Sequence, residues 1–184
     1  AAWPRALSNT FLARLVRNPR RASLAALGLA FVLYCAGARL VSAVIPSGDE
    51  PPYLVIMQSL LKDGDLQIEN NHRQGDYRAY YPGELRPDFL RRGTNGQIYS
   101  IHAPGLPVLA LPAFAVAGYP GVIVFLALLS ALGTWMVWRA AYRLTGSVAA
   151  AWVGGGAVAR SGPVFFPAFT AYPAAVAAAR GLPH

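Results

Sequence analysis

Residues 22–45 read ASLAALGLAFVLYCAGARLVSAVI, and this stretch decides the fold class of the chain. Its single charged residue is Arg39, which lies close enough to the far end to reach a polar boundary. A helix rises about 1.5 Å per residue, so the stretch is long enough to cross the roughly 30 Å hydrocarbon core of a bilayer. The sequence therefore predicts a transmembrane helix over residues 22–45.

The charges on either side of this stretch are sorted by sign. The chain of 184 residues carries 16 Lys and Arg against 8 Asp and Glu. All the acidic residues lie between positions 49 and 88, and the segments before and after them hold only basic ones. Only 13% of the residues are charged, against about 25% in a typical soluble domain. Like charges grouped between apolar runs are typical of the two sides of a membrane, and they argue against a soluble enzyme or a nucleic-acid-binding protein.

The pattern predicts an all-α fold of polytopic transmembrane helices with an extracytoplasmic loop that bears interfacial helices. The arginines near the N-terminus have no acidic neighbour, which predicts a cytoplasmic segment that is basic and amphipathic. The predicted order is this cytoplasmic segment at 1–21, a first transmembrane helix at 22–45, the extracytoplasmic loop at 46–119, a second transmembrane helix at 120–143, a third at 147–168 and the start of a fourth helix at 172–184. We interpret the chain as a fragment of a longer protein. The alternative for the first helix is a secretory signal peptide cleaved at residues 36–38, and the later apolar runs argue against it.

Two interfacial helices are expected within the loop. Apolar residues recur at helical spacing from Tyr53 onward and end at the stop signal of residues 62–64. Asp49 or Ser47 can cap this first helix. A second, interfacial or re-entrant helix is expected to start near Pro104. The polar stretch between them, residues 65–100, predicts an ordered loop with little regular structure.

The adjacent carboxylates Asp49 and Glu50 follow directly on the first predicted span. A carboxylate at the membrane boundary can take a proton from a hydroxyl group or help to hold a divalent metal against a phosphate. The alternative is structural: Asp49 caps the helix and Glu50 interacts favourably with the helix dipole. Composition alone leaves both interpretations open.

Two stretches of the sequence resemble the N-terminal part of GT-C glycosyltransferases, close to the family 39-like bacterial relatives of protein O-mannosyltransferases and aminoarabinose transferases. They are GDEPPYLVIMQSLLKDGDL at residues 48–66 and YSIHAPGLP at residues 99–107. The similar order and spacing extend over roughly residues 22–180. A departure occurs at Ala174, where an acidic residue often stands in that family.

This resemblance implies an integral membrane enzyme, in the inner or plasma membrane of a bacterium, that transfers a sugar with inversion. The implied donor is a polyprenyl-phosphate-linked sugar, and the acceptor is an unidentified glycan, lipid or protein outside the cytoplasm. The resemblance places Asp49 as the catalytic base or a metal-site carboxylate and Glu50 as a catalytic neighbour. A divalent cation is the one cofactor that it suggests, held by these two residues. Membrane lipid is an expected partner and nucleic acid is not.

Four further residues are candidates for substrate binding. His102 opens the second interfacial helix and can contact the phosphate or the acceptor; the alternative is a helix-start residue that bonds only the backbone. Arg78 and Arg86 supply the cations that an anionic lipid phosphate needs, unless they merely face solvent or headgroups. Tyr53, together with the loop tyrosines, can stack on a sugar or form an aromatic belt at the interface.

Two rival functions remain open at this stage. One is a non-catalytic polytopic membrane protein, such as a transporter segment or an assembly subunit. The other is an inactive, truncated copy of an enzyme, because three spans cannot enclose a lipid-donor cavity. We expect the fragment itself to be inactive and its parent protein to be an enzyme.

Overall fold

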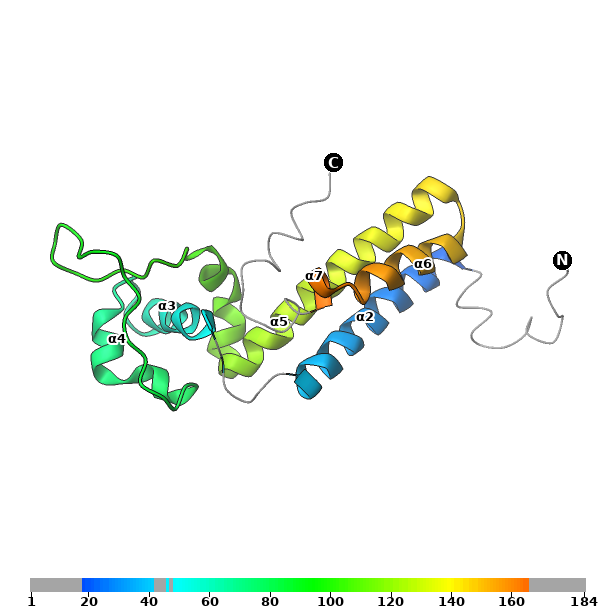
Figure 1. Cartoon of the computed structure of the whole chain (residues 1–184). Coiled ribbons are helices and arrows are strands. Elements are labelled where there is room, and N and C mark those ends of the chain that lie inside the picture. The colour runs from blue at the N-terminus through cyan, green and yellow to red at the C-terminus, as the bar shows by residue number, and fades with distance from the viewer. Residues whose placement is uncertain (1–17, 42–45, 47, 166–184) are drawn as a thin grey trace, which may run out of the picture.

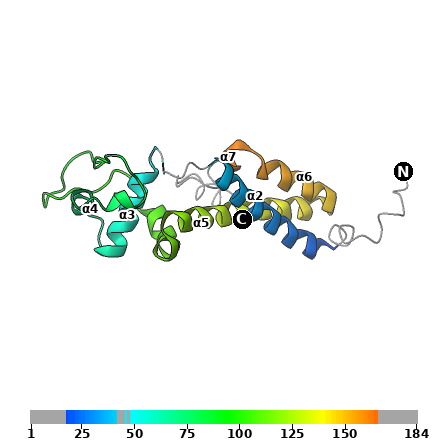
Figure 2. The same cartoon turned by 90° about the horizontal axis from the view of Figure 1, so that it is seen from below.

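The computed structural model describes residues 18–41, 46 and 48–165. Within these ranges the secondary structure is helical, and the β contribution is one isolated bridge between Gln67 and Tyr99. Figure 1 shows an elongated arrangement, with the bundle of long helices at one end and the loop helices at the other. The view from below in Figure 2 shows the same division. Most of the predicted cytoplasmic segment, residues 42–45, Ser47 and the predicted fourth helix lie outside the described residues.

The first long helix, α2, runs Pro19–Val41. It begins where Asn18 Oδ1 accepts hydrogen bonds from the backbone N–H groups of Arg20 at 3.0 Å and Arg21 at 3.4 Å. Pro19 occupies the first helical position, where a missing N–H costs nothing. The helix therefore starts three residues before the predicted boundary at residue 22.

The second long helix, α5, runs Gly105–Thr145 and joins two elements that the sequence predicts as separate. The backbone leaves helical geometry at Ala117 and at Gly118, where φ is +59° and ψ is −145°. This region is accessible essentially to glycine alone. The kink divides α5 into a first limb, residues 105–116, and a second limb, residues 119–145. The first limb is thus the helix expected to start near Pro104, and the non-helical residues Ala117 and Gly118 separate it from the predicted second span.

The bundle consists of α2, the second limb of α5, and α6 (Val148–Ala159). Small residues line the α2 face that is turned to its partners: Ala22, Ala26, Ala30 and Ala38 are all buried. Repeats of small residues at this spacing let helix backbones approach closely in membrane proteins. Two side-chain hydrogen bonds cross the same interface, from Trp135 Nε1 to Ser23 Oγ at 2.6 Å and between the hydroxyls of Tyr34 and Thr134 at 2.7 Å.

The predicted third span over residues 147–168 is not one continuous helix. Ser147 caps α6 by accepting a bond from the Ala150 N–H at 3.3 Å. The helix ends at Ala159, and after a turn the four-residue α7, Gly162–Phe165, follows. Twelve residues rise only about 18 Å, which is less than the hydrocarbon core.

Two helices of the described chain are long and apolar enough to cross a membrane: Pro19–Leu40 and Gly105–Thr145. In each, only 33% of the most apolar 18-residue stretch is buried inside the protein. Large apolar side chains are among the exposed residues, including Val32 at 64% and Leu29 at 61% exposure on α2. Contiguous exposed apolar surface of this kind is rare on soluble monomers.

The loop helices are α3 (Glu50–Lys62), α4 (Glu69–Gln74) and the 3₁₀ turn η2 (Asp76–Ala79). The amphipathic helix predicted after Asp49 is present as α3. Its core residues pack against the loop, in a cluster of Val55, Ile56, Ile68, Tyr77 and Ile98. The remainder of residues 65–100 is mostly turn and coil, as the sequence predicts, apart from α4 and η2.

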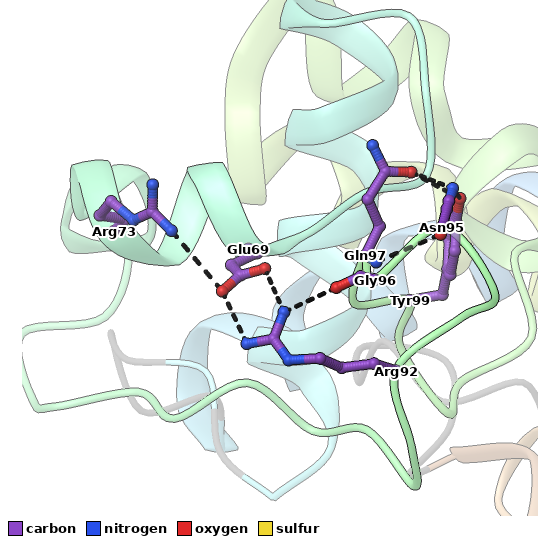
Figure 3. Close-up of polar contacts among 7 residues, drawn as sticks. All are labelled: Glu69, Arg73, Arg92, Asn95, Gly96, Gln97 and Tyr99. Atoms are coloured by element: carbon purple, nitrogen blue, oxygen red, sulfur yellow. Dashed lines mark hydrogen bonds and ion pairs between the residues drawn. The ribbon is translucent and has the colours of Figure 1, made fainter.

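An arginine fork ties the end of this loop to α4. Arg92 donates to both carboxylate oxygens of Glu69, at 2.8 and 3.0 Å, and to the carbonyl oxygen of Gly96 at 2.8 Å (Figure 3). The hydrogen bond from Arg92 holds the pKa of Glu69 below its usual value. Asn95, Gln97 and Tyr99 form further side-chain contacts in the same turn. The turn is thus ordered by polar contacts.

Candidate functional site

Asp49 precedes α3 and has an exposed carboxylate. Gly48 adopts φ +60° and turns the chain into the helix. Asp49 occupies the N-cap position, but its side chain makes no capping hydrogen bond. A cap accepts from the N–H of the second or third helical residue, and these are Pro51 and Pro52, which have none. The expectation that Asp49 caps the helix is therefore wrong, and its carboxylate is left to other partners.

Glu50, the neighbouring carboxylate, is buried with 3% of its surface exposed. The hydroxyl of Tyr119 donates to it, with distances of 3.3 Å to Oε1 and 3.5 Å to Oε2. Tyr119 lies immediately after the kink of α5, so the contact joins the start of α3 to the bend in the long helix. The two carboxylates thus differ in environment: Glu50 is a buried anchor, whereas Asp49 faces outward.

Tyr53 lies in α3, one helical turn after Asp49, and His102, from the stretch just before α5, packs beside it. Their rings are 4.8 Å apart between centroids, and His102 Nε2 is 3.1 Å from Asp88 Oδ2. Burial raises the pKa of the Tyr53 hydroxyl, and the negative charge of Asp49 raises it further. Asp49, Tyr53 and His102 therefore belong to one neighbourhood at the junction of α3 and α5. The imidazole of His102 contacts the side chain of Asp88. His102 is therefore not a helix-start residue that bonds only the backbone.

The expectation that Tyr53 stacks on a sugar is not met by its position. The residue is 5% exposed, because its ring packs in a core cluster with Leu54, Met57 and Leu106. Tyr77 is equally buried, in the loop core. Tyr80 packs on both clusters, and burial raises the pKa of its hydroxyl. These tyrosines form the interior of the loop and not an aromatic belt around it.

The two predicted loop cations are not gathered around Asp49. Arg78 lies in η2 and is exposed. Arg86 is exposed and pairs at 3.4 Å with Glu84, a neighbour in the sequence. Within the described ranges, neither arginine forms an ion pair with Asp49. The structure therefore brings together Asp49, Glu50, Tyr53 and His102, and leaves Arg78 and Arg86 at the loop surface.

A groove of about 790 Å³ lies between α2 and the second limb of α5. Its walls are apolar, with Phe31, Val32 and Ile123 among them. Two polar residues also line it: Arg39 near the end of α2, and Tyr119, whose hydroxyl contacts Glu50. Tyr119 thus lines this apolar groove and also contacts the carboxylate of Glu50.

The donor set for a metal is incomplete in the described part of the chain. No group of three or more His, Cys, Asp or Glu residues there is arranged to hold an ion. Glu50 directs its carboxylate toward the hydroxyl of Tyr119, and Asp49 is the only other acid in the adjacent sequence. The residues described do not by themselves make the cation site that the resemblance suggests.

Three residues of this neighbourhood are absent from the sequence-based candidates: Tyr119, Arg39 and Asp88. Tyr119 stands between Gly118 and Pro120, and such a break in an apolar run signals a bend that can turn a side chain inward. For Arg39 the sequence predicts only that the side chain reaches the interface. The contact of Asp88 with His102 depends on the path of the loop, which no spacing in the sequence reveals.

Comparison with known proteins adds nothing to this geometry. No protein-family model matches the chain, and no curated protein or solved structure is significantly similar to it.

Proposed function

We propose that the chain is part of an integral membrane glycosyltransferase of the GT-C type, which uses a polyprenyl-phosphate-linked sugar. In this proposal α2 and α5 cross the membrane, and the loop that carries all the acidic residues lies outside the cytoplasm. The grouped arginines before and within the start of α2 support a cytoplasmic N-terminus in this proposal. The exposed apolar side chains of both long helices support membrane insertion.

Asp49 is the proposed catalytic base. An acceptor hydroxyl attacks the anomeric carbon of the sugar, the bond from that carbon to the phosphate oxygen breaks, and the configuration inverts. The hydroxyl proton passes to Asp49, and the polyprenyl phosphate leaves with the bonding electron pair. Asp49 suits this role because its carboxylate is exposed and forms no capping bond. Glu50 is assigned as a positioning residue, because it is buried against Tyr119.

The groove between α2 and α5 is the proposed binding site for the donor lipid. Its apolar walls suit an isoprenoid chain, and Arg39 supplies a cation for the phosphate. The observation that carries the proposal is that Tyr119 takes part in both the groove and the carboxylate site. This residue lines the groove and also bonds the carboxylate next to Asp49, so a lipid in the groove would present its phosphate near the base.

The proposal is tested first by donor binding. Membrane vesicles containing the protein are incubated with a photoactivatable polyprenyl phosphate, and covalent labelling is measured. We expect labelling of the wild type, and at least a tenfold loss for Arg39→Gln. Arg73→Gln, a cation on the loop helix α4, is the matched control and should label normally. Equal labelling of Arg39→Gln and the wild type would remove the groove from the mechanism.

The chemistry is tested separately, by sugar transfer in vesicles that contain the protein at its natural length. The donor is a tritium-labelled polyprenyl-phosphate hexose, and the readout is label transferred to acceptor. Asp49→Asn should reduce transfer severely, by about 100-fold or more, while donor labelling persists. Glu84→Gln, which removes an exposed carboxylate from the same loop, should transfer normally. Near-normal transfer by Asp49→Asn would refute the assignment of the base.

The membrane orientation has its own test. Alkaline phosphatase fused at residue 70 should be active, and a fusion at residue 145 should be inactive, because only an extracytoplasmic reporter folds. A cytoplasmic residue 70 would overturn the glycosyltransferase proposal.

One observation favours a transporter segment as a second candidate. Arg160 follows the last residue of α6, where the helix breaks, and lines a groove of about 190 Å³ with Leu33 and Thr134. Leu33 lies well inside α2, so in the proposed membrane this groove is away from the ends of the spanning helix. A charged residue beside a broken helix at such a depth in the membrane is typical of transporter sites. Cysteine placed at Gly156, which also lines the groove, tests this idea in a Cys35→Ser background. Modification by a charged, water-soluble methanethiosulfonate would support the transporter, and complete protection would contradict it.

A further inference from the structure

The opposite end of the helix bundle carries a third groove, of about 460 Å³. It lies where α2 begins and α5 ends, and residues from both helices line it. The proposed catalytic neighbourhood is at the other end of α2, so this groove is separate from it (Figure 1). Nothing in the proposed sugar transfer uses these residues.

Three guanidinium groups line this groove: Arg20 from α2, and Arg139 and Arg143 from α5. All three are exposed, and none belongs to an ion pair among the described residues. The acidic residues of the chain all lie at positions 49–88, in the loop at the far end of the molecule. The groove is therefore a cluster of cations without protein counter-charges in the described part of the chain, and it is complementary to an anion.

Aromatic side chains form the walls between these cations. Arg139 lies over the ring of Trp135, 4.9 Å from its centroid, and the indole N–H of Trp135 donates to Ser23 across the helix interface. Tyr142 stacks on Trp138, with centroids 5.8 Å apart. The interhelical hydrogen bond and the stack fix the walls of the groove. Aromatic rings beside arginines are typical of the level of lipid headgroups in a bilayer.

We propose that this groove binds the headgroup of an anionic phospholipid. Guanidinium groups recognise phosphate oxygens through paired hydrogen bonds, and three of them surround the groove. The adjoining surface is apolar, with Leu24 on α2 exposed at 65%, so the acyl chains can run along the helix while the phosphate sits among the arginines. Basic pockets between membrane-spanning helices on the cytoplasmic side bind anionic headgroups by the same chemistry. A soluble phosphate would use only the cations and leave the apolar wall uncovered.

This inference depends on the membrane-spanning part of the proposed function and not on sugar transfer. Extraction with alkaline carbonate separates the two questions. A protein that leaves the membrane fraction would refute membrane insertion and this inference together. A protein that stays in the membrane but shows no lipid preference would refute only the lipid site.

The lipid site is tested in phosphatidylcholine vesicles that contain the full chain. A rising fraction of the lipid is replaced by dibrominated phosphatidylglycerol, which quenches tryptophan fluorescence at van der Waals range, and dibrominated phosphatidylcholine gives the baseline. The wild type should be quenched by the anionic lipid at a lower mole fraction than by the neutral one. Arg139→Gln with Arg143→Gln should weaken this preference about 30-fold, because each arginine near the surface contributes about a fivefold factor and the two factors multiply. Arg73→Gln with Arg91→Gln removes the same charge from the loop and should leave the preference unchanged.

Three results would overturn the inference. The first is equal quenching of the wild type by the two brominated lipids. The second is a loss of preference in the loop double variant as large as that in the groove variant. The third is loss of the preference in inorganic phosphate at millimolar concentration but not in chloride of equal ionic strength. That last result would identify a site for free phosphate in place of a lipid.

Discussion

The hydroxyl of Tyr119 donates to the buried carboxylate of Glu50, and this contact joins the kink of α5 to the first turn of α3. The two residues are 69 positions apart in the sequence. A buried carboxylate that loses a donor retains its desolvation cost, so such a contact matters more when broken than its distance suggests. The contact adds a polar link to the apolar packing that holds α3 against α5.

Tyr119→Phe should therefore destabilise the protein by about 1 to 3 kcal/mol, because it removes a donor from a buried carboxylate. The free energy of unfolding is measured by SDS titration in mixed micelles. Tyr142→Phe is the matched control on the same helix: its ring stacks on Trp138, and its hydroxyl forms no hydrogen bond in the part of the chain described. If both variants lose equal stability, the Glu50 contact has no special weight.

Asp49→Ala should change stability by no more than about 0.5 kcal/mol, because Asp49 makes no capping bond. Asn18→Ala should cost about 1 kcal/mol, since Asn18 accepts two backbone N–H groups at the start of α2. The same SDS titration compares the two substitutions. A loss for Asp49→Ala as large as that for Asn18→Ala would show that Asp49 stabilises α3 after all.

This contrast also shows what the sequence could have revealed. Asp49 and Asn18 have the same cap-forming chemistry, but Asn18 is followed by one proline and Asp49 by Glu-Pro-Pro. The prolines remove both N–H groups that a cap at Asp49 would use, so local covalent chemistry alone could have corrected that expectation. The long apolar runs likewise predicted α2 and the second limb of α5, because their length and hydrophobicity are local properties.

Other features depend on tertiary packing and could not be predicted in this way. The prolines at 104, 107 and 112 predict a helix separate from the second span, and the non-helical backbone at Ala117 and Gly118 separates the two limbs, but those prolines do not reveal that the bend is made at Gly118. Tyr53 looked like a sugar-stacking residue, and only the packing of α3 on α5 buries it. The contact of Tyr119 with Glu50 likewise needs the kink.

The buried hydroxyl pair of Tyr34 and Thr134 should couple α2 to α5. Tyr34→Phe and Thr134→Val each remove one partner, and a double-mutant cycle isolates the interaction between them. Hydrogen bonds between membrane helices average about 0.6 kcal/mol in such cycles, so we expect a coupling energy of about 0.5 to 1.5 kcal/mol. The cycle is run on unfolding free energies. Strictly additive losses would mean that the 2.7 Å contact contributes nothing specific.

The loop should weaken in mild acid through His72. Burial lowers the pKa of His72 below its usual value of 6.5, while a hydrogen bond to the Leu85 carbonyl opposes this effect. As the pH falls, His72 therefore takes up a proton in the unfolded loop at a higher pH than in the folded loop. The free energy that stabilises the folded loop has its full value above about pH 6.5 and decreases as the pH drops below it. Amide hydrogen exchange of residues 68–98, corrected for intrinsic rates, measures this between pH 7.5 and 5. The pKa of Glu69 is lowered by its contact with Arg92, so that carboxylate contributes its pH dependence at lower pH. His72→Gln should abolish the dependence above pH 5, and an unchanged profile in this variant would assign it to another group.

The kink of α5 should be the position least tolerant of a single added methyl group. Gly118 has φ +59°, which strains any other residue by about 1 to 3 kcal/mol. A Cβ at Gly121 would collide with the carbonyl oxygen of Ala113, a backbone atom that cannot turn aside. Gly118→Ala and Gly121→Ala should both lower the unfolding free energy, and because the kink sets Tyr119 against Glu50, both should also accelerate hydrogen exchange at the start of α3.

Gly133→Ala is the matched control in the second limb: nothing lies within 4 Å of its added Cβ, so helix propensity should leave it neutral or up to about 1 kcal/mol more stable. If all three variants lose stability alike, the effect belongs to glycine in this helix generally. Loss confined to Gly118→Ala and Gly121→Ala, with faster exchange at α3, would establish that the bend positions the carboxylate pair.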